Sequence, residues 1–221
     1  MPSRMNLFGT FALVTAVSVV ALLFSEWRVL KSDRGRLGVW IAKPLASSSF
    51  IAASLVQGWP ESAYGRAVVV ALVLSWWGDV LLIPKAQKIF LAGILAFLSA
   101  HLAYAVAFLV RGVSLGWIAG AAAPMTILGV IVGRFFVKSA PPGLKGAVVA
   151  YIGVLSTMVI LAFGAYGRGG GVLLPIAAVA FYLSDISVAL NRFVRPSIVH
   201  RAWGTPLYFG AQLLFAATAL R

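Results

Sequence analysis

Eight apolar stretches run along the chain, and short segments rich in charged and turn-forming residues separate them. A helix needs about 20 mostly apolar residues to cross the hydrocarbon core of a bilayer, and each stretch is close to that length. The separating segments, such as Ser139 to Gly143, are too short to form a soluble domain. We therefore predict an all-α, polytopic membrane protein in which residues 1–221 form a single bundle of eight transmembrane helices. The expected spans are approximately 7–24, 37–56, 67–83, 89–110, 113–133, 146–166, 171–190 and 203–220.

Composition excludes a soluble protein. Apolar residues make up 62% of the chain and charged residues only 10%, whereas a soluble domain carries about 25% charged residues. The chain has no cysteine, which excludes disulfides, thiolate nucleophiles and zinc sites built from cysteine. The first stretch is too long for the apolar part of a signal peptide and is read as the first span.

The basic residues lie mainly in the connections and indicate how the bundle is oriented. The connections after the odd-numbered spans hold 12 Lys and Arg, the other connections and the termini hold 5, and Lys43 lies within the second span. The positive-inside rule then predicts a multi-pass protein of the cell inner membrane, with the odd connections in the cytoplasm and both termini outside. We expect the basic loops to contact anionic lipid headgroups, which explains the charge of +13 without nucleic acid.

Polar residues inside the spans are the candidates for chemistry. Only two carboxylates lie there, Asp79 near the end of the third span and Asp185 near the end of the seventh. A charge deep in a spanning helix costs at least about 2.5–3.5 kcal/mol, so it usually faces a cavity or a partner. Lys43, six residues into the second span, reaches a similar depth from the cytoplasmic side. Three further polar residues lie nearer the midplane: His101, Tyr104 and Gln212.

Each of these residues also has a purely structural interpretation. Lys43 could extend to the cytoplasmic interface, or form an ion pair with the two aspartates. His101 and Tyr104 could be hydrogen-bond partners between helices, and Gln212 could hold helices together. We nevertheless assign a functional role to the aspartates, because acids within membrane spans usually mark functional sites.

Two similar segments suggest an internal duplication. The third span ends with Ser75-Trp76-Trp77-Gly78-Asp79-Val80-Leu81-Leu82, and the seventh ends with Tyr182-Leu183-Ser184-Asp185-Ile186-Ser187-Val188-Ala189-Leu190. A tyrosine follows each aspartate in the next span, 25 residues later at Tyr104 and 23 residues later at Tyr208. This similarity is consistent with a parallel 4+4 repeat, which would place both acids at one depth in the membrane.

Taken in order and spacing, several short segments resemble the lysoplasmalogenase family, also called YhhN-like membrane proteins. The matching segments are Lys43-Pro44, Gly78-Asp79-Val80-Leu81-Leu82, Phe97-Leu98-Ser99-Ala100-His101-Leu102-Ala103-Tyr104, Ser184-Asp185 and Tyr208-Phe209-Gly210-Ala211-Gln212-Leu213-Leu214. The resemblance implies an eight-helix membrane fold. It also implies a hydrolase that acts on the vinyl-ether bond of lysoplasmalogens and releases a fatty aldehyde and a glycerophospho-alcohol.

Vinyl-ether hydrolysis needs a proton donor for the alkenyl carbon, a negative charge near the resulting oxocarbenium ion, and a base for water. Two carboxylates, one protonated and one ionised, meet that need, as they do in glycosidases. We expect Asp185 to be the acid and Asp79, if it lies nearer Lys43, to be the ionised carboxylate. The residues expected to bind substrate or support these two are Lys43, His101, Tyr104, Tyr182, Ser184, Tyr208 and Gln212.

The substrate would be a lysophospholipid taken from the bilayer, with its alkenyl chain among apolar helices and its phosphate near Arg34, Lys85 or Arg192. No metal and no other cofactor is expected. Two other classes of function remain open. A proton-coupled transporter or lipid translocator would bury acids between repeats in the same way. A metal-dependent membrane amidase would use Asp and His as ligands, although a zinc site usually has more nitrogen ligands than this chain offers.

Overall fold

The computed structural model describes residues 4–32, 35–56, 58, 60–84 and 86–219. These residues form helices and no strands, which confirms the all-α class. Short 3₁₀ or π turns, η1 (Pro142–Leu144), η2 (Tyr166–Gly170) and η3 (Leu190–Val194), adjoin the helices. The long helices are α1 (Arg4–Ser32), α2 (Arg36–Leu55), α3 (Ala63–Leu81), α4 (Gln87–Arg111), α5 (Leu115–Ser139), α6 (Lys145–Ala165), α7 (Leu173–Ala189) and α8 (Ile198–Thr218).

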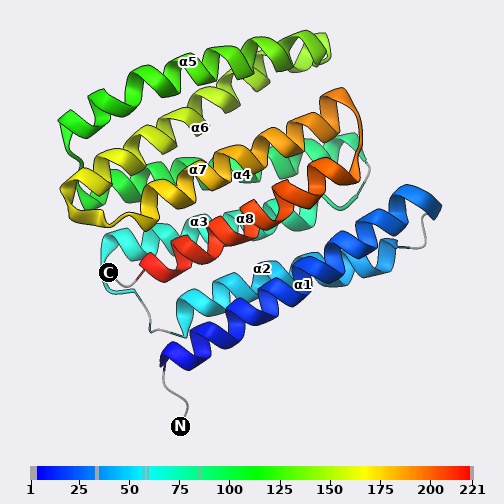
Figure 1. The fold of residues 1–221 in the computed structure, drawn as a ribbon, viewed down its shortest axis with the longest axis horizontal. Helices are drawn as coiled ribbons and strands as arrows, with labels where there is room; N and C mark the ends of the chain where they lie inside the picture. The colour runs from blue at the N-terminus through cyan, green and yellow to red at the C-terminus, as the bar shows by residue number, and fades with distance from the viewer. Residues whose placement is uncertain (1–3, 33–34, 57, 59, 85, 220–221) are drawn as a thin grey trace.

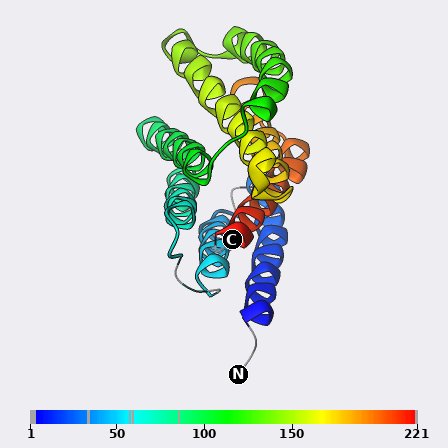
Figure 2. The same ribbon diagram turned by 90° about the vertical axis from the view of Figure 1, so that its left-hand side faces the viewer.

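Successive helices alternate in direction, as helices joined by short connections do (Figure 1). The connections that follow α1, α3, α5 and α7 therefore gather at one end of the bundle, and both termini lie at the other end. In both ribbon views α1 and α2 form one side of the molecule, while α5 and α6 form the opposite side (Figure 2). The four remaining helices, α3, α4, α7 and α8, lie between these two pairs.

Six of the described helices are long and apolar enough to cross a membrane, so the chain is an integral membrane protein. The helices α2 and α8 do not reach that hydropathy, because α2 contains Arg36, Lys43 and several serines, and α8 contains His200, Arg201 and Gln212. The count of eight spans and the 4+4 repeat therefore stay predictions. Several helices extend beyond the expected spans; for example, α1 continues to Ser32 rather than residue 24, and α5 to Ser139 rather than residue 133.

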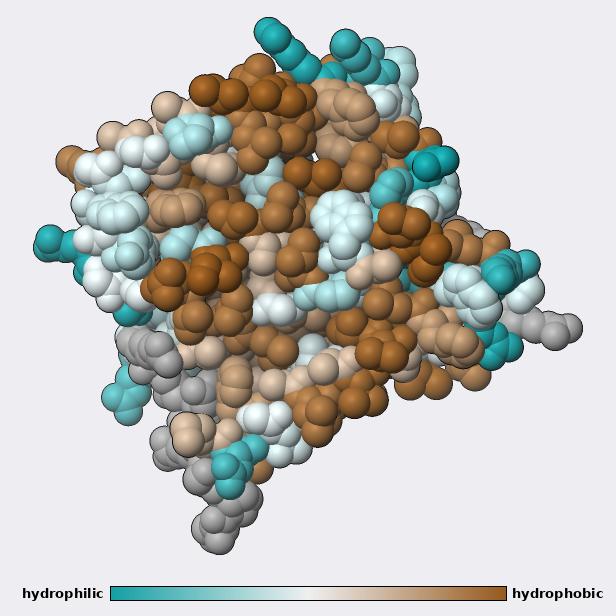
Figure 3. All heavy atoms as spheres, in the orientation of Figure 1, coloured by the Kyte–Doolittle hydropathy of each residue, from teal (hydrophilic) through white to brown (hydrophobic). Residues whose placement is uncertain are grey.

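The outer surface is largely apolar. Figure 3 shows a face on which apolar side chains cover most of the area and the most hydrophilic residues lie mainly at the periphery. Large hydrophobic side chains such as Leu102 on α4 and Ile127 and Ile131 on α5 are about half exposed or more. Apolar side chains of this kind can face lipid tails. The backbone N–H and C=O groups need no partner from the lipid, because they are hydrogen-bonded within each helix.

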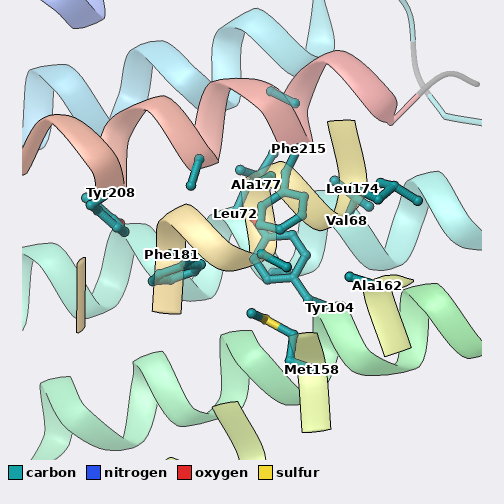
Figure 4. Packing of buried hydrophobic residues seen from close by; sticks show 14 of the residues in the cluster. Val68, Leu72, Tyr104, Met158, Ala162, Leu174, Ala177, Phe181, Tyr208 and Phe215 are labelled. Atoms are coloured by element: carbon teal, nitrogen blue, oxygen red, sulfur yellow. The ribbon is translucent and has the colours of Figure 1, made fainter. Parts of the chain in front are cut away.

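One buried cluster joins the central helices (Figure 4). At its centre the rings of Tyr104 on α4 and Phe215 on α8 stack, with their centroids 4.1 Å apart. Small residues let the helices approach closely, as membrane helices commonly do. A Cβ atom on Gly78 would lie only 2.6 Å from the Phe97 ring, so the close contact of α3 with α4 requires glycine immediately before Asp79.

The orientation of the bundle is testable with reporters. A reporter inserted in the connection between Arg134 and Lys145 should be cytoplasmic, and one fused after Arg221 should be outside, because of the asymmetry in basic residues. Reporter activity in intact cells measures both positions. A cytoplasmic signal from the C-terminal fusion would show that either the orientation or the number of spans is wrong.

Candidate active site

A cavity of 540 Å³ lies within the bundle, and all eight helices contribute to its lining. Most of its lining residues are apolar, but both Asp79 and Asp185 line it. Arg36, Pro84 and Arg192 also line it, and they lie at or next to the ends of α2, α3 and α7 where the odd connections gather. The cavity thus extends from the two buried acids to that end of the bundle.

Asp79 is surrounded by hydrogen-bond donors. Its side chain is only 2% exposed, and its Oδ1 lies 3.2 Å from the Lys43 ammonium. The Ser47 and Tyr208 hydroxyls donate to its Oδ2 at 2.5 Å and 2.6 Å. Lys43 and Ser47 lie one turn apart on α2 and therefore reach the same carboxylate. A cation and two hydrogen-bond donors around a carboxyl group favour its ionised form.

Asp185 has different partners. The Tyr151 hydroxyl on α6 donates to its Oδ2 at 2.7 Å, and His101 Nε2 on α4 lies 3.4 Å from the same oxygen. Among the described residues no Lys or Arg forms an ion pair with Asp185. The two acids at the cavity therefore differ in that only Asp79 has a permanent cation beside it.

Aromatic rings pack between the surroundings of Asp79 and those of Asp185. The Phe181 ring lies 5.4 Å from the ring of Tyr208, which donates to Asp79 (Figure 4). The same Phe181 ring lies 4.4 Å from the ring of His101, which faces Asp185. Phe97 also packs edge-on against Tyr208, with centroids 5.7 Å apart. These rings keep the interior beside the acids apolar, which strengthens every electrostatic interaction there.

The open end of the cavity is basic. The Arg192 guanidinium lies over the Phe90 ring at 4.0 Å, and Arg36 lines the same region. Arg201 forms an ion pair with Glu26 at 2.7 Å, which connects α8 to α1. The other two residues expected to meet a phosphate, Arg34 and Lys85, lie outside the described residues.

The family model described as the YhhN family matches residues 38–219. The chain belongs to the YhhN family. It is 31% identical to "Lysoplasmalogenase TMEM86A" of Bos taurus over 163 residues, and 31% identical to the protein of the same name from Homo sapiens over 160 residues. Both matches cover 69% of this chain but only 65% of the relative, so the chain spans about two thirds of the length of these curated proteins. No solved structure matches the chain.

In this YhhN family member, some of the other expected site residues line the cavity and others do not. Tyr182 and Ser184 line the cavity, although the Ser184 hydroxyl donates to the Phe181 carbonyl at 2.7 Å. Tyr104 and Gln212 are fully buried and do not line it, and the Tyr104 hydroxyl donates to Gln212 Oε1 at 2.6 Å. This hydrogen bond between Tyr104 and Gln212 joins α4 to α8.

Two polar contacts of the acids were not expected from the sequence: Ser47 with Asp79, and Tyr151 with Asp185. Both residues are compatible with an apolar helix, so neither interrupts the hydropathy pattern. The sequence could have indicated Tyr151 as a partner through its depth in the membrane. Tyr151 lies near the start of its span, at a depth similar to that of Lys43 in the second span. Within the described residues no three His, Asp or Glu side chains converge as a metal site would require.

The ion pair of Lys43 and Asp79 generates a prediction about stability. Lys43→Met leaves a buried carboxylate without its cation and should lower the free energy of unfolding by about 3 kcal/mol. Lys43→Met combined with Asp79→Asn should recover much of that loss, since neither charge remains. Denaturant unfolding in detergent measures both, with Lys138→Met at an exposed site on α5 as the control. Equal losses from Lys43→Met and Lys138→Met would contradict a stabilising role for the pair.

Proposed function

We propose that this protein is a membrane-embedded hydrolase that cleaves the vinyl-ether bond of lysoplasmalogens to a fatty aldehyde and a glycerophospho-alcohol. The observation that carries the proposal is the unlike pair of acids on one largely apolar cavity. Asp79 has a cation and two donors, whereas Asp185 pairs with no Lys or Arg among the residues that the structure describes. The names of the two curated relatives, both lysoplasmalogenases, support the same reaction.

The reaction begins with proton transfer from the Asp185 carboxyl group to the alkenyl carbon remote from the ether oxygen. The substrate becomes an oxocarbenium ion, and the ionised Asp79 stabilises this positive charge. Water then attacks the cationic carbon and gives its proton to the Asp185 carboxylate, which restores the acid. The resulting hemiacetal collapses, breaking its bond to the glycerol oxygen, to an aldehyde and an alcohol. One water is consumed for each ether bond cleaved, and the protein ends unchanged.

Asp79 suits the electrostatic role because it is charged before the substrate arrives. Its donors Ser47 and Tyr208 fix the carboxylate on α3 relative to α2 and α8, so little reorganisation accompanies the formation of the cation. Asp185 suits the role of acid because its surroundings among the described residues lack a Lys or Arg that would hold it ionised.

The shape of the cavity agrees with a single-chain lipid. Its apolar wall, which includes Ile94, Val132 and Leu155, provides a site for an alkenyl chain. Arg36 and Arg192 at its open end are placed to bind the phosphate, because guanidinium groups bind phosphate oxygens in pairs. Anionic headgroups of neighbouring lipids would be attracted to the same basic end.

The decisive prediction concerns Asp79→Asn and Asp185→Asn. Each substitution preserves shape but removes a charge or a transferable proton, so each should lower turnover by about 10²-fold or more. The double variant should lose much less than the product of the two, since groups that act as a unit are not additive. Release of aldehyde from lysoplasmalogen by purified protein measures turnover, and the thermal midpoint in detergent checks folding.

Glu61→Gln is the matched control, because it makes the same acid-to-amide change at an exposed site outside the cavity. Its turnover should equal that of the unmodified protein. Folded Asp79→Asn and Asp185→Asn proteins with normal turnover would exclude acid–base catalysis by the pair. Lipid translocation without aldehyde release, lost in the same variants, would identify a translocator instead.

A second prediction concerns metal. The proposed steps use only carboxylates and water, so prolonged treatment with a chelator should leave aldehyde release unchanged. Activity is measured before chelation, after it, and after zinc is added back. Loss on chelation with recovery on zinc would replace the carboxylate mechanism by a metal-dependent one.

A further inference from the structure

His101 faces Asp185 without facing the cavity. Its side chain is fully buried, and it is not among the residues that line the cavity. Its ring packs against the rings of Phe181 and Tyr151, with centroids 4.4 Å and 5.5 Å away. A substrate in the cavity therefore does not touch His101, and any effect of His101 on chemistry passes through Asp185.

The hydrogen bond of the first ring nitrogen identifies the tautomer. His101 Nδ1 lies 2.7 Å from the Phe97 carbonyl oxygen, one turn earlier on α4. A carbonyl oxygen only accepts, so Nδ1 carries a hydrogen and donates it. In the neutral ring the second nitrogen, Nε2, then has a lone pair and no hydrogen.

The second nitrogen points toward the acid. Nε2 is buried and has no conventional hydrogen bond within the described residues, and its nearest charged neighbour there is Asp185 Oδ2 at 3.4 Å. A lone pair on nitrogen opposite an ionised carboxylate oxygen is repelled. The repulsion becomes attraction when a proton lies between the two groups, so the pair favours the state that holds one proton.

The surroundings place that proton on the carboxyl group. An imidazolium would be enclosed by aromatic rings with no access to solvent, whereas the Asp185 side chain is 13% exposed at the cavity. A neutral imidazole beside a neutral carboxylic acid avoids a buried charge altogether.

Tyr151 acts in the opposite sense. Its hydroxyl donates to Asp185 Oδ2 at 2.7 Å, and a donor stabilises the ionised carboxylate more than the neutral acid. Resting on the proposed function, in which Asp185 is the acid, we propose that His101 and Tyr151 are opposed positioning residues: His101 holds the proton on Asp185, and Tyr151 stabilises the carboxylate left when the proton departs.

The test is an infrared titration of the full chain in lipid nanodiscs. A protonated carboxylic acid has a C=O band that a carboxylate lacks, and the band lost in Asp185→Asn but kept in Asp79→Asn belongs to Asp185. His101→Phe removes the acceptor of the protonated form, so the band should disappear about one pH unit lower. Tyr151→Phe removes the donor to the ionised form, so the band should persist to about one pH unit higher.

The other groups near the acid stay the same in both variants, so they do not produce opposite shifts. Tyr64→Phe is the control, because it removes a buried tyrosine hydroxyl that donates to Thr218 at 2.7 Å and does not line the cavity. It should leave the band of Asp185 unshifted. The remaining titratable or charged residues that line the cavity are Glu26, Arg36, Lys43, Asp79, Tyr182, Arg192, Arg201 and Tyr208.

Shifts of the Asp185 band in opposite directions in His101→Phe and Tyr151→Phe support the proposal. The pH at which aldehyde release declines on the alkaline side should shift in the same direction as the band. Shifts in one direction, no shift beyond that of Tyr64→Phe, or no Asp185 band at any pH overturn it. If His101→Phe does not fold, His101→Asn retains a donor for the Phe97 carbonyl and lacks Nε2, so the same shift is expected. The band is read without substrate, so opposite shifts in a protein that releases no aldehyde would reject the proposed function alone.

Discussion

A carboxylate buried among helices must be compensated, and the Asp79 site shows how this chain does it. Taking an ion out of water costs several kcal/mol unless partners from other elements surround it. Here the partners come from α2, through Lys43 and Ser47, and from α8, through Tyr208. The same contacts that compensate the charge therefore fix α3 relative to two helices that are themselves less apolar than the rest. The polar site and the arrangement of α2, α3 and α8 therefore depend on each other.

The two acids share a cavity but depend on different kinds of partner. Asp79 lies beside a permanent cation, whereas Asp185 lies beside His101 and accepts a hydrogen bond from Tyr151. Apolar rings, among them Phe181, lie between the two sets of partners. Such a division lets two acids with different surroundings share one interior.

The helices could be predicted from the sequence because an apolar stretch about 20 residues long has few other stable environments. Their ends could not: α1 continues beyond Glu26 and Arg28, since a charged side chain at the membrane surface does not interrupt backbone hydrogen bonding. The acids stood out because charge is rare in the spans. Their partners could not be recognised in this way, since pairing depends on which face of each helix turns inward. Tyr208 and Asp79, for example, are 129 residues apart in the chain.

Helix α5 is less buried in the molecule than α3 and α7, the helices that carry the two acids. It packs mainly against α6, and only 11% of its most apolar stretch is buried inside the molecule. Its Val132 and Phe136 nevertheless form part of the cavity wall. In the described part of the chain, none of the hydrogen bonds or ion pairs made by the two acids involves α5. The chain thus combines a hydrogen-bonded polar centre with one wall that contributes apolar side chains to the cavity. Evolution or protein engineering can therefore reshape that wall while leaving the two acids and their partners where they are.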